Sequence, residues 1–392
     1  MASNSVELRS VFWTAAIPEG PVSLFSWSIL GPSVQRALES HRAQGGFELS
    51  GPPLWQRQEG SVQVNEDALS DIQRDAPAVS QTTASLGQRL LGRGPTVDPG
   101  VASSEAAFES IHRWAQNVRS MAWQQATILQ VMEEIEPRAQ LALETWFRVS
   151  DKLVIVRDQS ADMLGKWLPQ EAQPLLAGFD QGLDSGLGEM HYRYALQQLQ
   201  QAAAENALTD EMGARFLRSF GHWAPLPLES ASPRWRQFGD QLGSEVIKAA
   251  ARDPGDLLDP SAARQTRASA ANEAKDRLGR LRRRQFEPLF QALQVLVEQL
   301  SASREALVTV MDASRTWALA AAREGIADGR LLAEEEVFLL ELEELKQMMT
   351  GEWSNPAQVH PLVQSRKGER WSKDQGCVVL PANARASSIQ LR

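Results

Sequence analysis

The sequence predicts a mainly α-helical protein, and three observations carry this prediction. Ala, Leu, Gln, Glu and Arg, all good helix formers, dominate the middle of the 392-residue chain. From Ser104 onward, apolar residues recur three and four positions apart, which is the period of one helix face. Alternating runs of Val, Ile and Thr, which are typical of strands, are few. We therefore expect a large helical domain with an irregular N-terminal section and a short C-terminal tail.

The N-terminal section, residues 1–74, is interrupted throughout by glycine and proline, so we expect only short elements in it. Ser33 is a candidate cap for a short helix over 34–42. A short strand is predicted at 61–64. Residues 75–104 are rich in Ala, Gly, Pro, Ser and Thr, and this composition predicts a loop or linker before the helical domain.

The predicted helical domain covers residues 105–350. Its first helix is expected to run from Ser104 to Ile135, and Pro137 is expected to end or kink it. A second apolar-periodic stretch begins at Leu141 and continues to between 153 and 164. The domain therefore opens with two amphipathic helices in sequence.

Two shorter helices are expected over 191–205 and 211–220. The loop that follows, residues 221–240, contains three prolines and two tryptophans. Two long helices are then predicted, over 268–300 and 303–324, because each carries a continuous apolar stripe. These long helices are expected to form the main body of the domain.

Pro288 lies inside the first of these long helices and is expected to kink it. A shorter helix is predicted over 334–349. The tail, residues 351–392, mixes turn-forming residues with one short apolar run at 378–380 that predicts a strand.

Composition and charge exclude several classes of protein. The net charge of −9 argues against a general nucleic-acid binder or a binder of anionic membranes. No apolar run approaches the roughly 18 to 20 residues that a membrane helix needs, and the N-terminus does not resemble a signal peptide. The single cysteine, Cys377, permits no internal disulfide and no cysteine-rich zinc site. We therefore expect a cytoplasmic protein with no nucleic-acid or membrane partner.

Most motifs that mark an enzyme are missing. There is no Gly-rich loop that ends in Gly-Lys-Ser or Gly-Lys-Thr, no Gly-x-Ser-x-Gly elbow and no His-Glu-x-x-His helix. None of the five histidines lies three or four positions from another, so the sequence predicts no local metal clamp. We expect neither a metal site nor a cofactor-binding site in this chain.

A run of arginines at 277–284 is the most basic segment of the chain. Such a run can grip a phosphate or an RNA backbone. It also opens a long amphipathic helix with acidic neighbours such as Glu273 and Glu287, and a solvated helix face is the interpretation we favour.

The densest group of polar and aromatic residues lies in the loop at 221–236. Its side chains include those of His222, Glu229 and Arg234. Together these supply an acid or base, a carboxylate and an anion clamp. The alternative interpretation is a Trp-rich loop that packs between helices, and the spacing of the residues leaves both open.

The same loop carries a resemblance to a known family. It resembles the Gly-His-Arg-Gly…Glu…Pro-Arg-Trp signature in the central region of phosphoenolpyruvate-synthase and pyruvate-phosphate-dikinase-like enzymes, especially the rifampin phosphotransferase branch. The residues that match this signature without gaps are Gly221, His222, Pro225, Glu229, Ala231, Pro233, Arg234, Trp235 and Arg236.

Further segments agree with that family in the expected order. Residues 21–28, Pro-Val-Ser-Leu-Phe-Ser-Trp-Ser, resemble its Pro-Val-Thr-Pro-Leu-Thr-Trp-Ser segment. Residues 60–65 resemble its Gly-Arg-Val-Tyr-x-Asn segment. Residues 325–345 resemble the segment that closes its helical region, and Arg304-Glu305 falls where the family has an Arg-Glu pair. The resemblance therefore covers nearly the whole chain.

The resemblance implies a division of labour among domains. Enzymes of this family combine an ATP-binding domain, a central helical domain that holds the acceptor, and a swivelling domain with a phosphorylated histidine. The chain resembles only the central domain. We therefore expect a subunit of a split phosphotransferase that binds a small-molecule acceptor. Partner chains would supply ATP, Mg²⁺ and the phosphohistidine.

The resemblance also implies roles for individual residues. His222 is the candidate catalytic acid or base. The candidate acceptor-binding residues are Glu229, Arg234, Trp235, Arg304 and Glu305.

The loop also departs from the family signature at several positions. Trp223 replaces an arginine, Ala224 and Leu226 replace glycines, and Pro227 replaces an acidic residue. These changes remove a cation and a carboxylate that could bind phosphate or move protons. They favour an alternative hypothesis, in which the chain is a degenerate, non-catalytic relative that acts as a binding or scaffold protein. We do not expect the chain to be a complete enzyme by itself.

Overall fold

The computed structural model describes residues 16–18, 20–44, 52–69, 101–180, 189–238, 259–353 and 355–368, and its fold is mainly α. The α-helices are α2 (Leu24–Gln44), α5 (Val101–Ser120), α6 (Gln125–Trp167), α7 (Ala172–Asp180), α8 (Met190–Ala204), α9 (Asp210–Phe220), α11 (Pro260–Arg277), α12 (Arg280–Ala327), α13 (Leu342–Thr350) and α14 (Pro356–Gly368). Short 3-10 helices are η1 (Trp235–Gln237) and η3 (Glu334–Leu339). The predicted fold class is confirmed.

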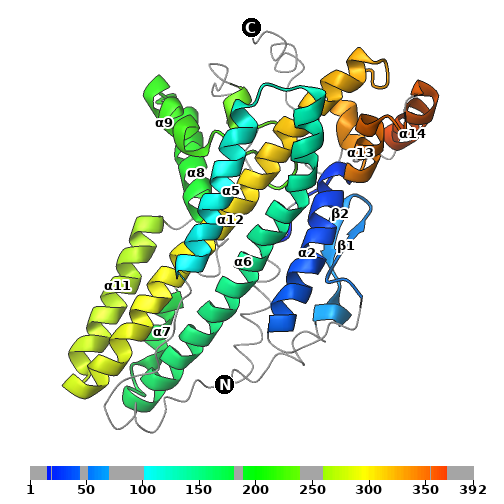
Figure 1. Ribbon diagram of the computed structural model, residues 1–392. Helices are drawn as coiled ribbons and strands as arrows, with labels where there is room; N and C mark the ends of the chain where they lie inside the picture. Colours follow the sequence, from blue (N-terminus) through cyan, green and yellow to red (C-terminus); the bar gives the residue numbers. More distant parts are fainter. Residues whose placement is uncertain are drawn as a thin grey trace.

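Helix α12 is the central element of the molecule (Figure 1). It runs the length of the bundle, with α6 and α5 beside it and α2 packed on the far side of α6 (Figure 1). The indole N–H of Trp317 in α12 donates to the carbonyl of Ile128 at the start of α6, over 2.8 Å. Leu164 near the end of α6 packs with Phe286 near the start of α12, so the two helices are antiparallel.

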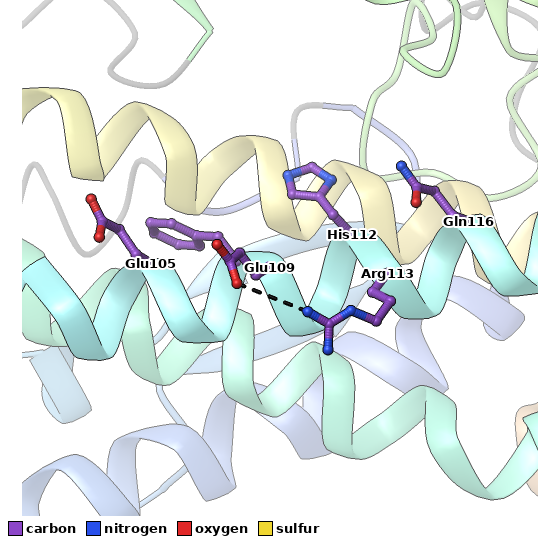
Figure 2. A pocket seen from close by; sticks show the side chains of 6 residues that line it. Glu105, Glu109, His112, Arg113 and Gln116 are labelled. Carbon is purple, nitrogen blue, oxygen red and sulfur yellow. Dashed lines mark ion pairs between the residues drawn. The ribbon is translucent and has the colours of Figure 1, made fainter.

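Helix α5 contributes both to the core and to the surface. Ile111, Trp114 and Ala115 are buried on its inner face. On its outer face, Glu109 and Arg113 form an exposed ion pair at 3.9 Å (Figure 2). A solvated pair of this kind adds little stability, so α5 is held mainly by its buried side.

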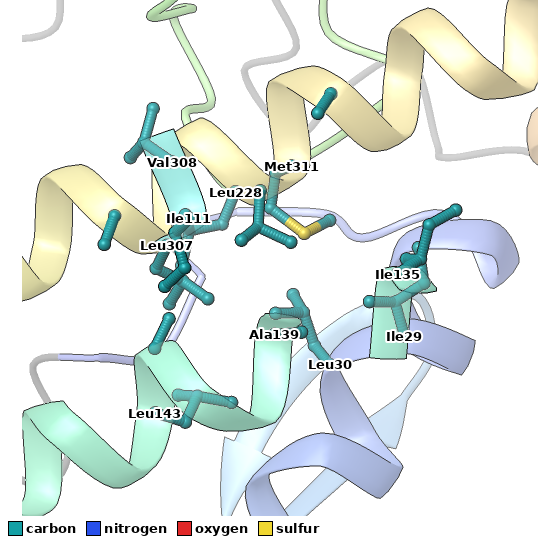
Figure 3. Packing of buried hydrophobic residues seen from close by; sticks show 14 of the residues in the cluster. Ile29, Leu30, Ile111, Ile135, Ala139, Leu143, Leu228, Leu307, Val308 and Met311 are labelled. Carbon is teal, nitrogen blue, oxygen red and sulfur yellow. The ribbon is translucent and has the colours of Figure 1, made fainter. Parts of the chain in front are cut away.

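The main core forms where α2, α5, α6 and α12 meet (Figure 3). Ile29, Ile111, Leu143 and Met311 come from these four helices, and Leu228 joins them from the loop before η1 (Figure 3). A second apolar cluster holds α7 and α11 against the ends of α6 and α12. None of the helices in the described ranges has the length and hydropathy of a membrane-crossing segment.

A two-stranded antiparallel hairpin, β1 (Trp55–Gln58) and β2 (Ser61–Val64), packs beside α2. Glu59 and Gly60 both have positive φ, which gives the two-residue turn the twist that a tight hairpin needs. The predicted strand at 61–64 is confirmed, whereas its partner β1 was not predicted.

Pro137 lies inside α6, so of the two outcomes expected there, a helix end or a kink, the helix end is wrong. Helices α6 and α12 continue through Pro137 and Pro288. Each proline removes the N–H that would bond to the carbonyl four residues earlier. These carbonyls belong to the exposed residues Glu133 and Arg284, so water can replace the lost partner.

The predicted breaks between long helices also differ from those observed. The helix expected over 104–135 is interrupted at 121–124, where the hydroxyl of Thr127 accepts the N–H of Gln124 and starts α6. The helix expected over 268–300 is interrupted at 278–279, and α12 then runs without a break. Apolar spacing passes through each of these junctions, so periodicity alone does not reveal them.

Other boundaries need correction. Helix α2 begins ten residues before the helix predicted over 34–42, and Ser33 is buried within it instead of capping it. The helix expected over 334–349 is divided into η3 and α13, because the carboxylate of Glu344 accepts the N–H of Glu341 and starts a new helix.

Helices α7 and α14 were not predicted from the sequence. The strand expected at 378–380 and most of the linker expected at 75–104 lie outside the described residues. The domain boundaries at 74 and 104 therefore remain predictions.

Packing between α7 and α11 generates a testable prediction. A Cβ added at Gly178 would lie 2.8 Å from the Cβ of Ala270, whereas a Cβ added at Gly165 in α6 would meet no atom within 4 Å. We expect Gly178→Ala to lower the free energy of unfolding by about 1–3 kcal/mol, because the two helices must separate. Urea unfolding measures the change.

The control variant is Gly165→Ala. It should raise the free energy of unfolding by about 0.5–1 kcal/mol, because alanine is the better helix former and space is free at this position. Equal effects of the two substitutions would show that α7 does not pack on α11 as described.

Candidate functional site

The segment from Gly221 to Phe238 connects α9 to the body of the bundle and folds back on itself. The N–H of Trp235 donates to the carbonyl of Trp223 over 2.9 Å, and the N–H of Arg236 donates to the carbonyl of Gly221 over 2.8 Å. Most of its side chains are buried, including the unbroken run at 226–230. This central loop is therefore part of the interior.

His222 and Trp223 both contact the carboxylate of Glu305 in α12. The Nε2 of His222 lies against Oε1 of Glu305, and the indole N–H of Trp223 donates to Oε2 over 2.8 Å. The side chains of His222 and Glu305 are 16% and 31% exposed, so this pair reaches solvent. A half-buried imidazole held by a carboxylate is an arrangement suited to proton transfer.

His112 of α5 lies within electrostatic range of the same pair. Burial lowers the pKa of His112, the Glu305 carboxylate opposes this change, and His222 adds to it. His112 also lines a surface groove with Phe108, Gln116 and other residues of α5 (Figure 2). His112 therefore lies in this groove and within electrostatic range of the His222–Glu305 pair.

Glu229 fastens the central loop to the start of α2. Its carboxylate accepts the backbone N–H groups of Ser23 and Ala231, each over 2.6 Å, and the hydroxyls of Ser23 and Ser26. Burial raises the pKa of Glu229, although these four hydrogen bonds oppose the rise. The Ser23 N–H lies at the N-terminus of α2, where a carboxylate accepts an otherwise unpaired N–H group and interacts favourably with the helix dipole. Glu229 therefore acts as a cap supplied from a distant part of the chain.

Asp312 of α12 is fully buried and pairs with three arginines, one from α5 and two from the central loop. Arg119 of α5 donates to Oδ2 from Nε over 3.0 Å, and its Nη2 lies 2.8 Å away. Arg236 of the loop donates to Oδ1 over 2.5 Å, and Nε of Arg234 lies 3.7 Å from the same oxygen. Asp312 thus joins α5, α12 and the central loop.

Arg234 is fully buried and only partly satisfied. Its Nη1 donates to the carbonyl of Pro227 over 3.0 Å, while Nε and Nη2 have no hydrogen-bond partner. Burial lowers the pKa of Arg234 to about 10; Asp312 opposes this change and Arg236 adds to it. An unsatisfied buried guanidinium is costly, so Arg234 lowers the stability of the fold unless its remaining N–H groups find a partner.

Arg304 pairs with Glu189, just before α8. Its Nε donates to Oε1 of Glu189 over 2.8 Å, and its Nη1 donates to the carbonyl of Ala16. Burial alone would raise the pKa of Glu189, but Arg304 and Arg193 together hold it below its usual value. The pair connects α12, α8 and the N-terminal section.

Trp235 belongs to an aromatic cluster. Its indole N–H donates to the hydroxyl of Tyr192 over 3.0 Å, and its ring contacts Phe216 edge to face. The ring of Trp223 stacks on Tyr192 with centroids 4.4 Å apart. These rings hold α8 and α9 on the loop.

The structure therefore brings together two of the six candidate residues, His222 and Glu305. The groups of Glu229, Trp235 and Arg304 are occupied by internal contacts, and Arg234 lies beneath the surface. Their roles in acceptor binding remain predictions.

Sequence reasoning assigned no site role to several residues of this region: Ser23, Ser26, His112, Arg119, Arg236, Asp312 and Arg315. The sequence contains one feature that could have identified Asp312 as a functional residue. It interrupts an apolar run between Met311 and Ala313 on a helix, and an aspartate that is buried by periodicity needs a partner. The identity of that partner depends on contacts between distant segments, which spacing does not show.

Comparison with known proteins does not assign the chain to a family. No protein-family model matches the chain, and no curated protein matches it significantly. Within the described residues, no group of three or more His, Cys, Asp or Glu side chains is placed to hold a metal ion.

The Arg304–Glu189 pair generates a prediction. Arg304→Gln should lower the free energy of unfolding by about 3–5 kcal/mol, because it leaves a buried carboxylate without its main partner. Arg193→Gln should cost no more than about 1 kcal/mol, because this second partner is partly exposed. Chemical denaturation at neutral pH measures both.

The loss should also depend on pH. The pKa of Glu189 is lowered in the folded state, so its stabilising effect is present above the usual pKa of about 4.3 and is lost as the pH falls through the lowered value. The difference between wild type and Arg304→Gln should therefore shrink in acid. A constant difference would contradict the pairing.

Proposed function

We propose that the chain is the acceptor-binding subunit of a split phosphotransferase that resembles the central domain of phosphoenolpyruvate-synthase-like enzymes. The observation that supports this proposal is the His222–Glu305 pair, which reaches solvent and acts electrostatically on His112 of α5. The sequence resemblance of the central loop to that family adds to it. Partner chains supply ATP, Mg²⁺ and a phosphohistidine.

In this proposal the pair handles one proton. Glu305 orients the imidazole of His222 through Nε2, which leaves Nδ1 to accept the proton of an acceptor hydroxyl. The acceptor oxygen bonds to the phosphorus as the bond between phosphorus and the partner's histidine breaks. The carboxylate stabilises the imidazolium that forms, as an acid–base pair requires.

A second candidate function is a non-catalytic scaffold. The observation that favours it is the internal use of Glu229, Trp235 and Arg304, three of the residues that the resemblance assigns to acceptor binding. In addition, the indole N–H of Trp223 donates to the second carboxylate oxygen of Glu305, and the family signature has an arginine at the position of Trp223. The two candidates differ in their dependence on His222.

The single cysteine, Cys377, is consistent with the reducing cytoplasm, where we place the chain.

The test begins with a native pull-down of the tagged chain and mass spectrometry of the proteins that accompany it. We expect a nucleotide-binding chain and a phosphohistidine chain in fixed ratio. A chain that returns alone, or with unrelated proteins, would contradict the split-enzyme proposal.

The isolated complex then allows a variant test. His222→Gln should lower acceptor-dependent ATP consumption by roughly 10²- to 10⁴-fold, the usual contribution of a general acid or base. Glu305→Gln should act in the same direction, because it removes the charge that orients His222.

The control is His191→Gln, which removes an exposed histidine of α8 and should leave the rate unchanged. If His222→Gln retains full activity, the scaffold function gains and the proton-transfer role fails.

A further inference from the structure

Four guanidinium groups gather around one buried carboxylate. Arg119 and Arg236 donate to Asp312, and Arg234 lies beside it. Arg315, one turn further along α12, donates to the carbonyl of Ser230 over 2.7 Å. Burial, reinforced by the charge of Arg234, lowers the pKa of Arg315 to about 9, while Glu229, Asp312 and Glu335 oppose the change. The group therefore holds more positive charge than Asp312 neutralises.

Glu229 is another buried carboxylate near these arginines, but its hydrogen bonds are not made to any of them. Its oxygens accept from Ser23, Ser26 and Ala231. Meanwhile Nη2 of the fully buried Arg234 has no hydrogen-bond partner, and its Nε has only the Asp312 carboxylate, 3.7 Å away. Asp312 thus serves three guanidinium groups at once, so an anion bound beside them would add the counter-charge that one carboxylate cannot supply to all three.

The outer members of the group are open to solvent. The side chains of Arg119 and Arg236 are 32% and 38% exposed, whereas Asp312 and Arg234 lie beneath them. Asp312 fixes both outer guanidinium groups, one on each of its oxygens. Guanidinium groups held in place in this way bind tetrahedral oxyanions through paired N–H donors.

We propose that Arg119, Arg234, Arg236 and Arg315 form a binding site for a phosphate-like oxyanion. The anion contacts Arg119 and Arg236 from the solvent side, and the buried Arg234 and the partly buried Arg315 add to the positive potential. Asp312 keeps the outer guanidinium groups in position, so that little rearrangement is needed when the anion binds.

The position of this site suggests a class of acceptor. Glu305 and Asp312 are seven residues apart on α12, so the two sites are separated by about 10 Å along the helix axis. If the proposed function holds, on which this step rests, the acceptor carries an anionic group about 10 Å from the hydroxyl that reacts near His222.

The test uses the intact chain and inorganic phosphate in calorimetric titrations at low ionic strength. We expect saturable binding with one site per chain. Arg236→Gln should weaken it roughly 10- to 100-fold, the effect of losing hydrogen bonds to a charged group. The control Arg215→Gln, which removes a 73% exposed arginine of α9, should change the affinity less than about twofold.

Two further variants keep the test decisive. Arg119→Gln should weaken binding to a similar extent and replaces Arg236→Gln if that variant fails to fold. Arg236→Lys keeps the charge but loses the planar fork, so an intermediate affinity is expected.

Absence of saturable phosphate binding, or equal affinity of wild type, Arg236→Gln and Arg119→Gln, would overturn the proposal. Binding of phosphate needs no partner chain. Its failure would therefore leave the role of His222 intact, whereas loss of transfer activity with phosphate binding retained would count only against the split enzyme.

Discussion

A loop that runs through the interior of a helical bundle must satisfy its polar groups without water, and this constraint shapes the structure around Gly221–Phe238. Three carboxylates accept many of the hydrogen bonds that anchor this loop. Glu229 connects the loop to the first turn of α2, Glu305 accepts from His222 and Trp223, and Asp312 accepts from Arg236 as well as from α5. Each contact joins segments that are far apart in sequence. The loop therefore helps to define the relative positions of α2, α5 and α12.

Helix α12 provides the frame for these contacts. Glu305 and Asp312 are one heptad apart and so lie on the same side of the helix, and Arg119 of α5 follows His112 by the same interval. The pairing of Arg119 with Asp312, and the electrostatic effect of Glu305 on His112, show that α5 and α12 run in parallel. The His222–Glu305 pair and the arginines around Asp312 therefore lie on one face of α12, two helix turns apart, and both reach solvent.

The sequence predicted the helical class because apolar periodicity depends on local spacing. The junction before α6 and the continuity through Pro137 escaped it, because these depend on Thr127 and on the exposure of the proline. The motif also drew attention to His222 and Glu305 separately, but their contact joins positions 83 residues apart. For Arg234, the sequence suggested an anion clamp, whereas its burial and unsatisfied N–H groups became visible only in the folded chain.

The central loop is a fixed part of the interior. Native-state hydrogen exchange tests it most directly, through the amides of Ala231, Trp235 and Arg236, which donate within the loop. We expect these amides to exchange as slowly as those of the buried centre of α12, because they open only when the core does. Exchange at the rate of exposed loop amides, with α12 still protected, would contradict it.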